Sequence, residues 1–252
     1  MTSPASQPVY DRIGVTYAHY RKPDPRVGRQ IHRALGPACP VLNVGAGTGS
    51  YEPPGRCVGV EPSTVMLAGR PAGSAPVGRG LAEALPFRDG IFNAAMAVLT
   101  VHHWTDPVAG FAEMRRVTRG PIVVLSWDAE VFARFWLIRD YLPEVAAAER
   151  SLMTVHAIAG LLAPCRVQVV PVPHDCTDGF SAAYWRRPEM YLNADVQQAI
   201  SNLALLDQTV VRRMTENLAR DLSSGAWQRR NQALLERDEL DCGYRLVVAD
   251  PS

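Results

Sequence analysis

The chain has 252 residues, a formal net charge of +1 and 47% hydrophobic residues, a balance that suits one α/β domain with an appended cap. Its charges are dispersed and its apolar runs are too short to cross a bilayer, which argues against a nucleic-acid surface and against a membrane span. The five cysteines show no C-x-x-C spacing, so we expect no disulfide framework, no metal site and a cytoplasmic location.

The N-terminal part of the chain predicts helices ahead of the first strand. We expect residues 1–8 to form a disordered tail, because they are rich in Ser, Thr and Pro. Residues 9–40 are expected to form helices. Pro23 and Pro25 divide this helical pattern in two, because proline disrupts a helix interior and disfavours the helical conformation in the residue before it.

Residues 41–49, with the sequence VLNVGAGTG, predict a buried strand followed by a tight glycine turn. Residues 57–60 predict a second strand, which delivers Glu61 to the same edge of the sheet. A carboxylate at that edge can accept two hydrogen bonds from a ribose diol. The two features together predict a nucleoside cofactor.

The spacing in this region bears on which nucleoside is bound. The glycines follow a G-x-G-x-G pattern with Glu61 sixteen residues after Gly45, whereas the dinucleotide pattern is G-x-G-x-x-G with an acid about 20 residues further on. The connection 50–56 has seven residues, two of them proline, which leaves no room for the usual crossover helix. Without a helix dipole, the amides of the glycine turn would have to bind the cofactor as a nest. This arrangement disfavours a dinucleotide that carries a pyrophosphate.

Further motifs follow in chain order. Residues 80–87 read GLAEALPF, residues 92–104 predict a strand and a turn with two histidines, and residues 121–127 predict a fifth strand after a helix. Together with the glycine turn, these segments resemble class I S-adenosylmethionine-dependent methyltransferases, in particular small bacterial enzymes with a type 11-like core. In that family, residues 80–87 correspond to an adenine-binding loop that normally reads GDAExLPF.

The resemblance implies an α/β fold with a Rossmann-like, seven-stranded, mostly parallel sheet whose last strand is antiparallel. It also implies an N-terminal lid helix and a helical cap insertion. We therefore expect the core at residues 41–177, the cap at residues 178–240 and the final core strand at residues 241–252. Within the cap, apolar residues at spacing four from Leu206 to Leu222 predict a helix with one buried face, which Gly225 ends.

The resemblance further implies that S-adenosylmethionine is the methyl donor and S-adenosylhomocysteine the product. The residues expected to bind this cofactor are Gly45, Ala46, Gly47, Gly49, Glu61, Pro62, Ala82, Glu83, Leu99, Tyr17 and Arg21.

Two of these residues belong to the expected lid. Tyr17 would lie against the sulfonium as a cation–π partner, and Arg21 would pair with the methionyl carboxylate. The alternative is that both residues only pack the lid or face solvent. Asn43 and Leu81 stand where the family usually has Asp, so we expect recognition of the adenine to move from position 81 to Glu83 or to backbone groups.

His102 and His103 follow the predicted fourth strand at the ligand-bearing edge of the sheet, which makes them candidate catalytic bases. His103 is favoured because it occupies the family's more typical histidine position. The alternative is that both histidines orient the loop or contact the cofactor through their backbone. The aromatic segment 184–191 also has two interpretations, a substrate pocket or ordinary packing of the cap, and the second is favoured.

The predicted function is direct methyl transfer from S-adenosylmethionine to a small-molecule acceptor, whose nucleophile is oxygen, nitrogen or carbon. One alternative is a protein that binds S-adenosylmethionine without methyl transfer, and a less favoured one is an NAD-dependent oxidoreductase. We expect no nucleic-acid or membrane partner, and the sequence does not indicate an oligomeric state.

Overall fold

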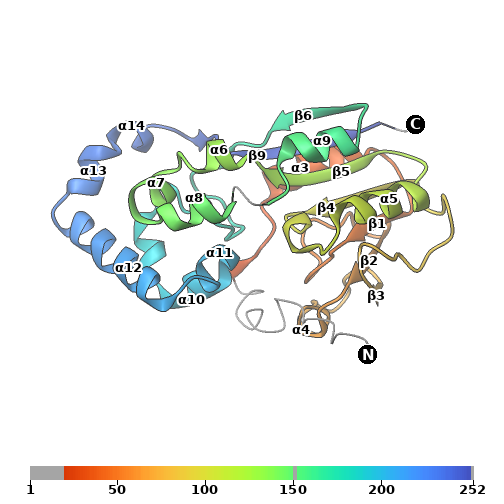
Figure 1. The fold of residues 1–252 in the computed structure, drawn as a ribbon, viewed down its shortest axis with the longest axis horizontal. Coiled ribbons are helices and arrows are strands. Elements are labelled where there is room, and N and C mark those ends of the chain that lie inside the picture. Colours follow the sequence, from red (N-terminus) through yellow and green to blue (C-terminus); the bar gives the residue numbers. More distant parts are fainter. Residues whose placement is uncertain (1–19, 150–151, 251–252) are drawn as a thin grey trace.

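The computed structural model describes residues 20–149 and 152–250. The expected disordered tail and Tyr17 lie outside the described residues. A lobe built on a β-sheet and a lobe built from helices lie side by side (Figure 1). Within the described ranges, no helix has both the length and the apolar character needed to cross a membrane.

A seven-stranded sheet, counted over the described residues, organises the first lobe in the spatial order β3-β2-β1-β4-β5-β9-β6. Strand β9 runs antiparallel to its neighbours β5 and β6, and the other pairings are parallel. The predicted Rossmann-like sheet with an antiparallel last strand is therefore confirmed. The strands are β1 Val41–Val44, β2 Cys57–Glu61, β3 Val77–Arg79, β4 Ala94–Val98, β5 Ile122–Trp127, β6 Cys165–Val169 and β9 Tyr244–Ala249.

Both faces of the sheet are covered, because alternate residues of each central strand enter different apolar clusters. In β4, Met96 joins one cluster and Ala97 the other. Helix α3, Pro25–Leu35, covers the first face and contacts β4 and β5. Helices α5, Pro107–Val117, and α9, Val155–Leu161, belong to the cluster on the second face. The short helix α4, Thr64–Ala68, lies beside β2.

The helical lobe includes α6 to α8, so it begins before residue 178. Its centre is aromatic: the Trp136 ring lies 5.2 Å from the Trp227 ring, and Trp136 Nε1 donates to the Trp185 carbonyl at 2.8 Å. Trp185 and Tyr191 are fully buried here, which supports the packing interpretation of the segment 184–191. The elements of this lobe are α6 Ala129–Phe132, α7 Trp136–Tyr141, α8 Pro143–Glu149, η2 Pro188–Leu192, α10 Ala194–Ala199, α11 Ser201–Ala204, α12 Gln208–Ser223, α13 Ala226–Arg230 and α14 Gln232–Leu235.

Helix α12 has the buried face that its spacing predicts. Met214 and Leu218 are fully buried. Leu206 and Leu222, at the two ends of the apolar stripe, are half-buried against the same core. Gly225 follows the helix in the left-handed conformation, with φ +70°. A two-stranded sheet of β7, Val172–Pro173, and β8, Glu239–Leu240, joins the start and the end of the segment that carries η2 and α10 to α14.

Candidate active site

The glycine turn follows β1 and is held by β2. The amides of Gly45 and Ala46 both donate to the Val60 carbonyl, at 2.9 and 3.0 Å, and the amide of Gly49 donates to the Ala46 carbonyl. The connection 50–56 contains turns and no helix, as its length predicts. The nest of free amides predicted from this short connection is wrong for these three residues, because their N–H groups are already used to hold the turn.

The three glycines of the turn have different roles. A Cβ at Gly45 would lie 2.0 Å from Thr100 Oγ1, so this glycine allows the turn to pack against the segment after β4. A Cβ at Gly49 would meet Glu52 and Arg70 at 3.0 to 3.2 Å. A Cβ at Gly47 would meet one described atom within 4 Å, the flexible Met66 Cε at 3.4 Å. Of the three glycines, Gly47 therefore has the most open space beside it, and it lines the first cavity described below.

Glu61 lies at the end of β2 with its carboxylate fixed by two backbone amides. Its Oε2 accepts from Gly47 N and its Oε1 accepts from Ser63 N, both at 2.8 Å. An ionised carboxylate has about four acceptor sites, so it can bind the turn and a diol together. The predicted placement of Glu61 beside the glycine turn is thus present in the structure.

A buried polar network beneath the turn was not predicted. Arg70 donates to Glu52 Oε2 at 2.7 Å and to the Gly47 carbonyl at 3.1 Å, and Asn43 Nδ2 donates to Glu52 Oε1 at 3.2 Å. An Asp at position 43 would set a second carboxylate against Glu52, whereas Asn supplies a donor. The unusual Asn43 is therefore explained by Glu52, which comes from the short connection.

The segment that resembles the adenine-binding loop is clamped to the start of α5. Glu83 Oε1 accepts from the amides of Thr105 and Asp106 at 2.7 and 3.0 Å. Leu81 is 55% exposed and lines the same cavity as the glycine turn. Glu83 thus holds the loop in place, and Leu81 presents an apolar surface where the family usually has an acid.

A first cavity of about 180 Å³ brings most of the predicted residues together. The sequence-predicted residues that line it are Arg21, Gly45, Ala46, Gly47, Glu61, Pro62, Ala82, Glu83, Leu99 and His103. Gly49 and His102 are absent from its described lining, and Tyr17 lies outside the described residues.

A second cavity of about 430 Å³ lies between the sheet lobe and the helical lobe. His102 lines this cavity, together with residues of α8 and of the region around α11. Arg21, Leu99 and His103 line both cavities. These three residues therefore form the boundary across which the two spaces meet.

The two histidines lie in the 3₁₀ helix η1, Val101–His103, directly after β4. Their ring centroids are 3.7 Å apart, and the His102 ring also meets the edge of Trp127 at 4.7 Å. Burial lowers the pKa of His103 to about 4 and lowers that of His102 well below its usual value. Both imidazoles are neutral at pH 7, and each is a weaker base than one whose pKa lies near 7.

Arg21 is held by a buried carboxylate. Its Nε donates to Asp178 Oδ1 at 2.6 Å, and Asp178 Oδ2 accepts from the Tyr51 hydroxyl at 2.8 Å. Asp178 has no exposed surface. It therefore joins three parts of the chain: the segment ahead of α3, the connection after the glycine turn and the first residues of the predicted cap. Sequence reasoning missed Asp178, because it is 157 positions from Arg21.

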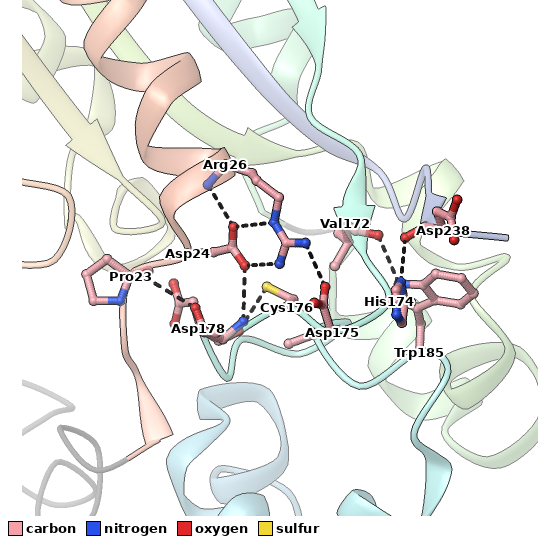
Figure 2. A network of polar contacts seen from close by, with 12 residues as sticks. Pro23, Asp24, Arg26, Val172, His174, Asp175, Cys176, Asp178, Trp185 and Asp238 are labelled. Atoms are coloured by element: carbon pink, nitrogen blue, oxygen red, sulfur yellow. Dashed lines mark hydrogen bonds and ion pairs between the residues drawn. The ribbon is translucent and has the colours of Figure 1, made fainter.

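Neighbouring contacts strengthen this junction (Figure 2). The Asp24 carboxylate caps α3 by accepting from Arg26 N, and it also accepts from Thr177 N at 3.1 Å. Burial alone would raise the pKa of Asp24, but hydrogen bonds from Arg26 and Thr177 lower it to about 2. Arg26 also pairs with Asp175 at 2.6 Å. Asp24 and Arg26 thus bind the start of α3 to residues 175–177, which follow β7 and precede the predicted cap.

Comparison with known proteins agrees with this geometry. A methyltransferase domain family matches residues 42–121, which run from β1 through η1 and α5. A demethylmenaquinone methyltransferase of Mycolicibacterium vanbaalenii is 30% identical over 159 residues, which cover 60% of this chain and 70% of that protein. The [4+2]-cyclase SpnF, at 14% identity and a TM-score of 0.55, covers 98% of this chain and 97% of its own and shares the fold.

The crystal structure of a putative methyltransferase from an antibiotic biosynthesis pathway of Anabaena variabilis superimposes with a TM-score of 0.84 and 32% identity. The match covers 91% of this chain and 98% of that one, so it extends over the helical lobe as well as the sheet. With its glycine turn, its Glu61 and its strand order, the chain belongs to the class I S-adenosylmethionine-dependent methyltransferase family and is an enzyme of that family.

Proposed function

We propose that this protein binds S-adenosylmethionine in the first cavity and transfers its methyl group to a small-molecule acceptor in the second. The observation that carries the proposal is the common boundary of the two cavities, formed by Arg21, Leu99 and His103. A methyl donor on one side of this boundary and a nucleophile on the other have a direct path between them.

The residues of the first cavity fit the cofactor. The Glu61 carboxylate is oriented by the amides of Gly47 and Ser63 and accepts hydrogen bonds from the ribose hydroxyls. The open side of Gly47 leaves room for the ligand, and Leu81 and Ala82 offer apolar contact to the base. When bound, the cofactor supplies a methyl group activated by a sulfonium.

We propose that Arg21 binds the methionyl carboxylate, because Arg21 supplies the guanidinium group on the described lining of the first cavity. A guanidinium has five N–H donors, so it can bind a second carboxylate while its Nε keeps Asp178. Asp178 then acts as a positioning residue for Arg21.

His103 is proposed to orient the acceptor. A neutral imidazole can accept a hydrogen bond from a hydroxyl or amine and hold the nucleophile in line. Positioning of this kind contributes about 7–11 kcal/mol to well-oriented reactions, so the enzyme does not require a strong base. The low pKa of His103 favours this orienting role over general-base catalysis.

Isothermal titration with S-adenosylhomocysteine, S-adenosylmethionine and NAD tests the cofactor assignment. We expect both adenosyl ligands to bind and NAD to give no heat. Preferential binding of NAD would contradict the proposal. Binding of S-adenosylhomocysteine without methyl transfer to any acceptor in a broad panel would favour the alternative of a non-transferring binding protein.

His103→Ala separates orientation of the acceptor from cofactor binding. With an identified acceptor, we expect turnover to fall much more than the affinity for S-adenosylhomocysteine, because the side chain contacts the acceptor side of the boundary. Unchanged turnover would leave His103 with a role in shaping the loop only.

A further inference from the structure

The second cavity has a mostly apolar and aromatic wall. The rings of Trp127, Phe132, Phe180 and Tyr244 line it, and aliphatic side chains fill much of the rest. Its volume of about 430 Å³ is typical of small-molecule sites, which span about 300–1,000 Å³. Burial of apolar surface is the main driving force that such a wall offers to a ligand.

The ionisable groups on the described lining already have partners or are neutral. Arg21 pairs with the buried Asp178 at 2.6 Å. Glu149 Oε2 accepts from Trp127 Nε1 at 2.7 Å, and burial raises the pKa of this carboxyl group. The histidines are neutral at pH 7, as their lowered pKa values require. The charge of Arg21 is therefore compensated by Asp178, the histidines carry no charge, and the raised pKa of Glu149 disfavours its ionised form.

The helical lobe gives the cavity one polar area. Glu149, Ser181 and Asn202 line it, and Asn202 Nδ2 donates to Ser181 Oγ at 3.1 Å. The Ser181 hydroxyl and the Asn202 amide exchange hydrogen bonds readily with a neutral polar group, whereas a carboxylate or an ammonium ion beside them loses hydration without gaining an opposite charge from either.

We propose that the methyl acceptor is an uncharged, largely apolar ring compound that presents its nucleophile at His103 and a neutral hydrogen-bonding group to Glu149, Ser181 and Asn202. This inference rests on the proposed function, because it takes the second cavity as the acceptor site. It excludes amino acids, nucleotides and polyamines as acceptors, since each would bring a formal charge into the cavity.

Three probes that differ in charge test the inference: naphthalen-2-ylmethanol, naphthalene-2-carboxylate and naphthalen-2-ylmethylammonium. Each is titrated into protein saturated with S-adenosylhomocysteine. We expect the alcohol to bind at least about ten-fold more tightly than either ion, because it alone keeps its polar group satisfied. A preference for either ion, or no binding of any probe, would overturn the inference.

The titration with S-adenosylhomocysteine comes first, so that two failures are distinguished. If this ligand does not bind, the proposed function itself is contradicted, and the inference with it. If it binds and the probes show the wrong order, only the acceptor class is contradicted. Tight binding of the ammonium probe that is lost in Glu149→Gln would also overturn the inference, because it would identify an ionised Glu149 as the anchor.

A charged residue introduced at the edge of the second cavity tests whether the probes bind in that cavity. Leu205 lines the second cavity and is 50% exposed, so Leu205→Arg needs no repacking. We expect it to shift the ratio of alcohol to carboxylate affinity by about five-fold towards the carboxylate. Leu235→Arg is the matched control, because Leu235 is 38% exposed and lies on the described lining of neither cavity. Equal effects of the two substitutions would mean that the probes bind elsewhere.

Discussion

Glu61→Gln tests whether the carboxylate serves the turn, the ligand or both. In the structure, its two oxygens each accept one backbone N–H at 2.8 Å, from Gly47 and from Ser63. A glutamine at this position has one oxygen and one NH₂ group, so at least one of these N–H donors faces another donor. An unsatisfied buried donor costs about 1–3 kcal/mol, and we expect the free energy of unfolding to fall by about that amount.

The same substitution removes the negative charge offered to the ribose. Hydrogen bonds to charged groups contribute about 1.5–3 kcal/mol, and a change of 1.4 kcal/mol alters a dissociation constant about ten-fold. We therefore expect the dissociation constant of S-adenosylhomocysteine to rise about ten- to hundred-fold. Isothermal titration measures the affinity, and urea unfolding measures the stability of the same preparation.

Glu113→Gln is the matched control. Glu113 also accepts a backbone amide, from Leu85 at 2.9 Å, and pairs with Arg116, but it lies on the described lining of neither cavity. We expect this variant to lose stability and to keep its affinity for S-adenosylhomocysteine. If Glu61→Gln binds within about two-fold of the unsubstituted protein, the reasoning is refuted and Glu61 only holds the turn.

Three other predictions have distinct expected results. Gly47→Val should abolish binding of S-adenosylhomocysteine by filling the first cavity. Gly55→Val is the control, because Gly55 has a comparable positive φ (+71° against +51°) and open space around it, and it should lower stability alone. Calorimetry compares the affinities of the two variants. The pKa of His103 is about 4 in the folded state, against an ordinary value of 6.5, so the free energy of unfolding falls as the pH falls from 6.5 towards 4. The loss should be about 2 kcal/mol at pH 5. Urea unfolding at pH 7 and pH 5 should show a smaller loss for His103→Gln than for the unsubstituted protein. Asp178→Asn removes the buried carboxylate that pairs with Arg21 at 2.6 Å and should lower the free energy of unfolding by about 3–5 kcal/mol. The double variant with Arg21→Met should recover part of this loss. An equal loss in the single and double variants would contradict the ion pair.

The sheet lobe could be predicted because its signals are local. The apolar run of β1, the glycine turn and the short connection to β2 are each visible within a few residues, and Glu61 follows β2 directly. The buried face of α12 was likewise visible as a spacing of four. Patterns of this kind depend on residues that are neighbours in sequence as well as in space.

The parts that could not be predicted depend on contacts between distant segments. Asp178 meets Arg21 and Tyr51 only after the cap entry folds against the glycine connection. The nest prediction was wrong for Gly45 and Ala46, because their hydrogen bonds to Val60 follow from the parallel register of β1 and β2, which composition does not reveal. The low pKa of His103 likewise follows from burial by several elements.

The two cavities draw their walls from different regions, and this division bears on how the enzyme diversifies. The first cavity, proposed for the methyl donor, is built chiefly by strand ends and turns of the sheet lobe. The second cavity, proposed for the acceptor, is built chiefly by α8 and by residues 180–206 of the helical lobe. Gene duplicates can therefore acquire new acceptors through substitutions in the helical lobe while they keep the same methyl donor. Arg21, Leu99 and His103 are the exception, because these three residues line both cavities.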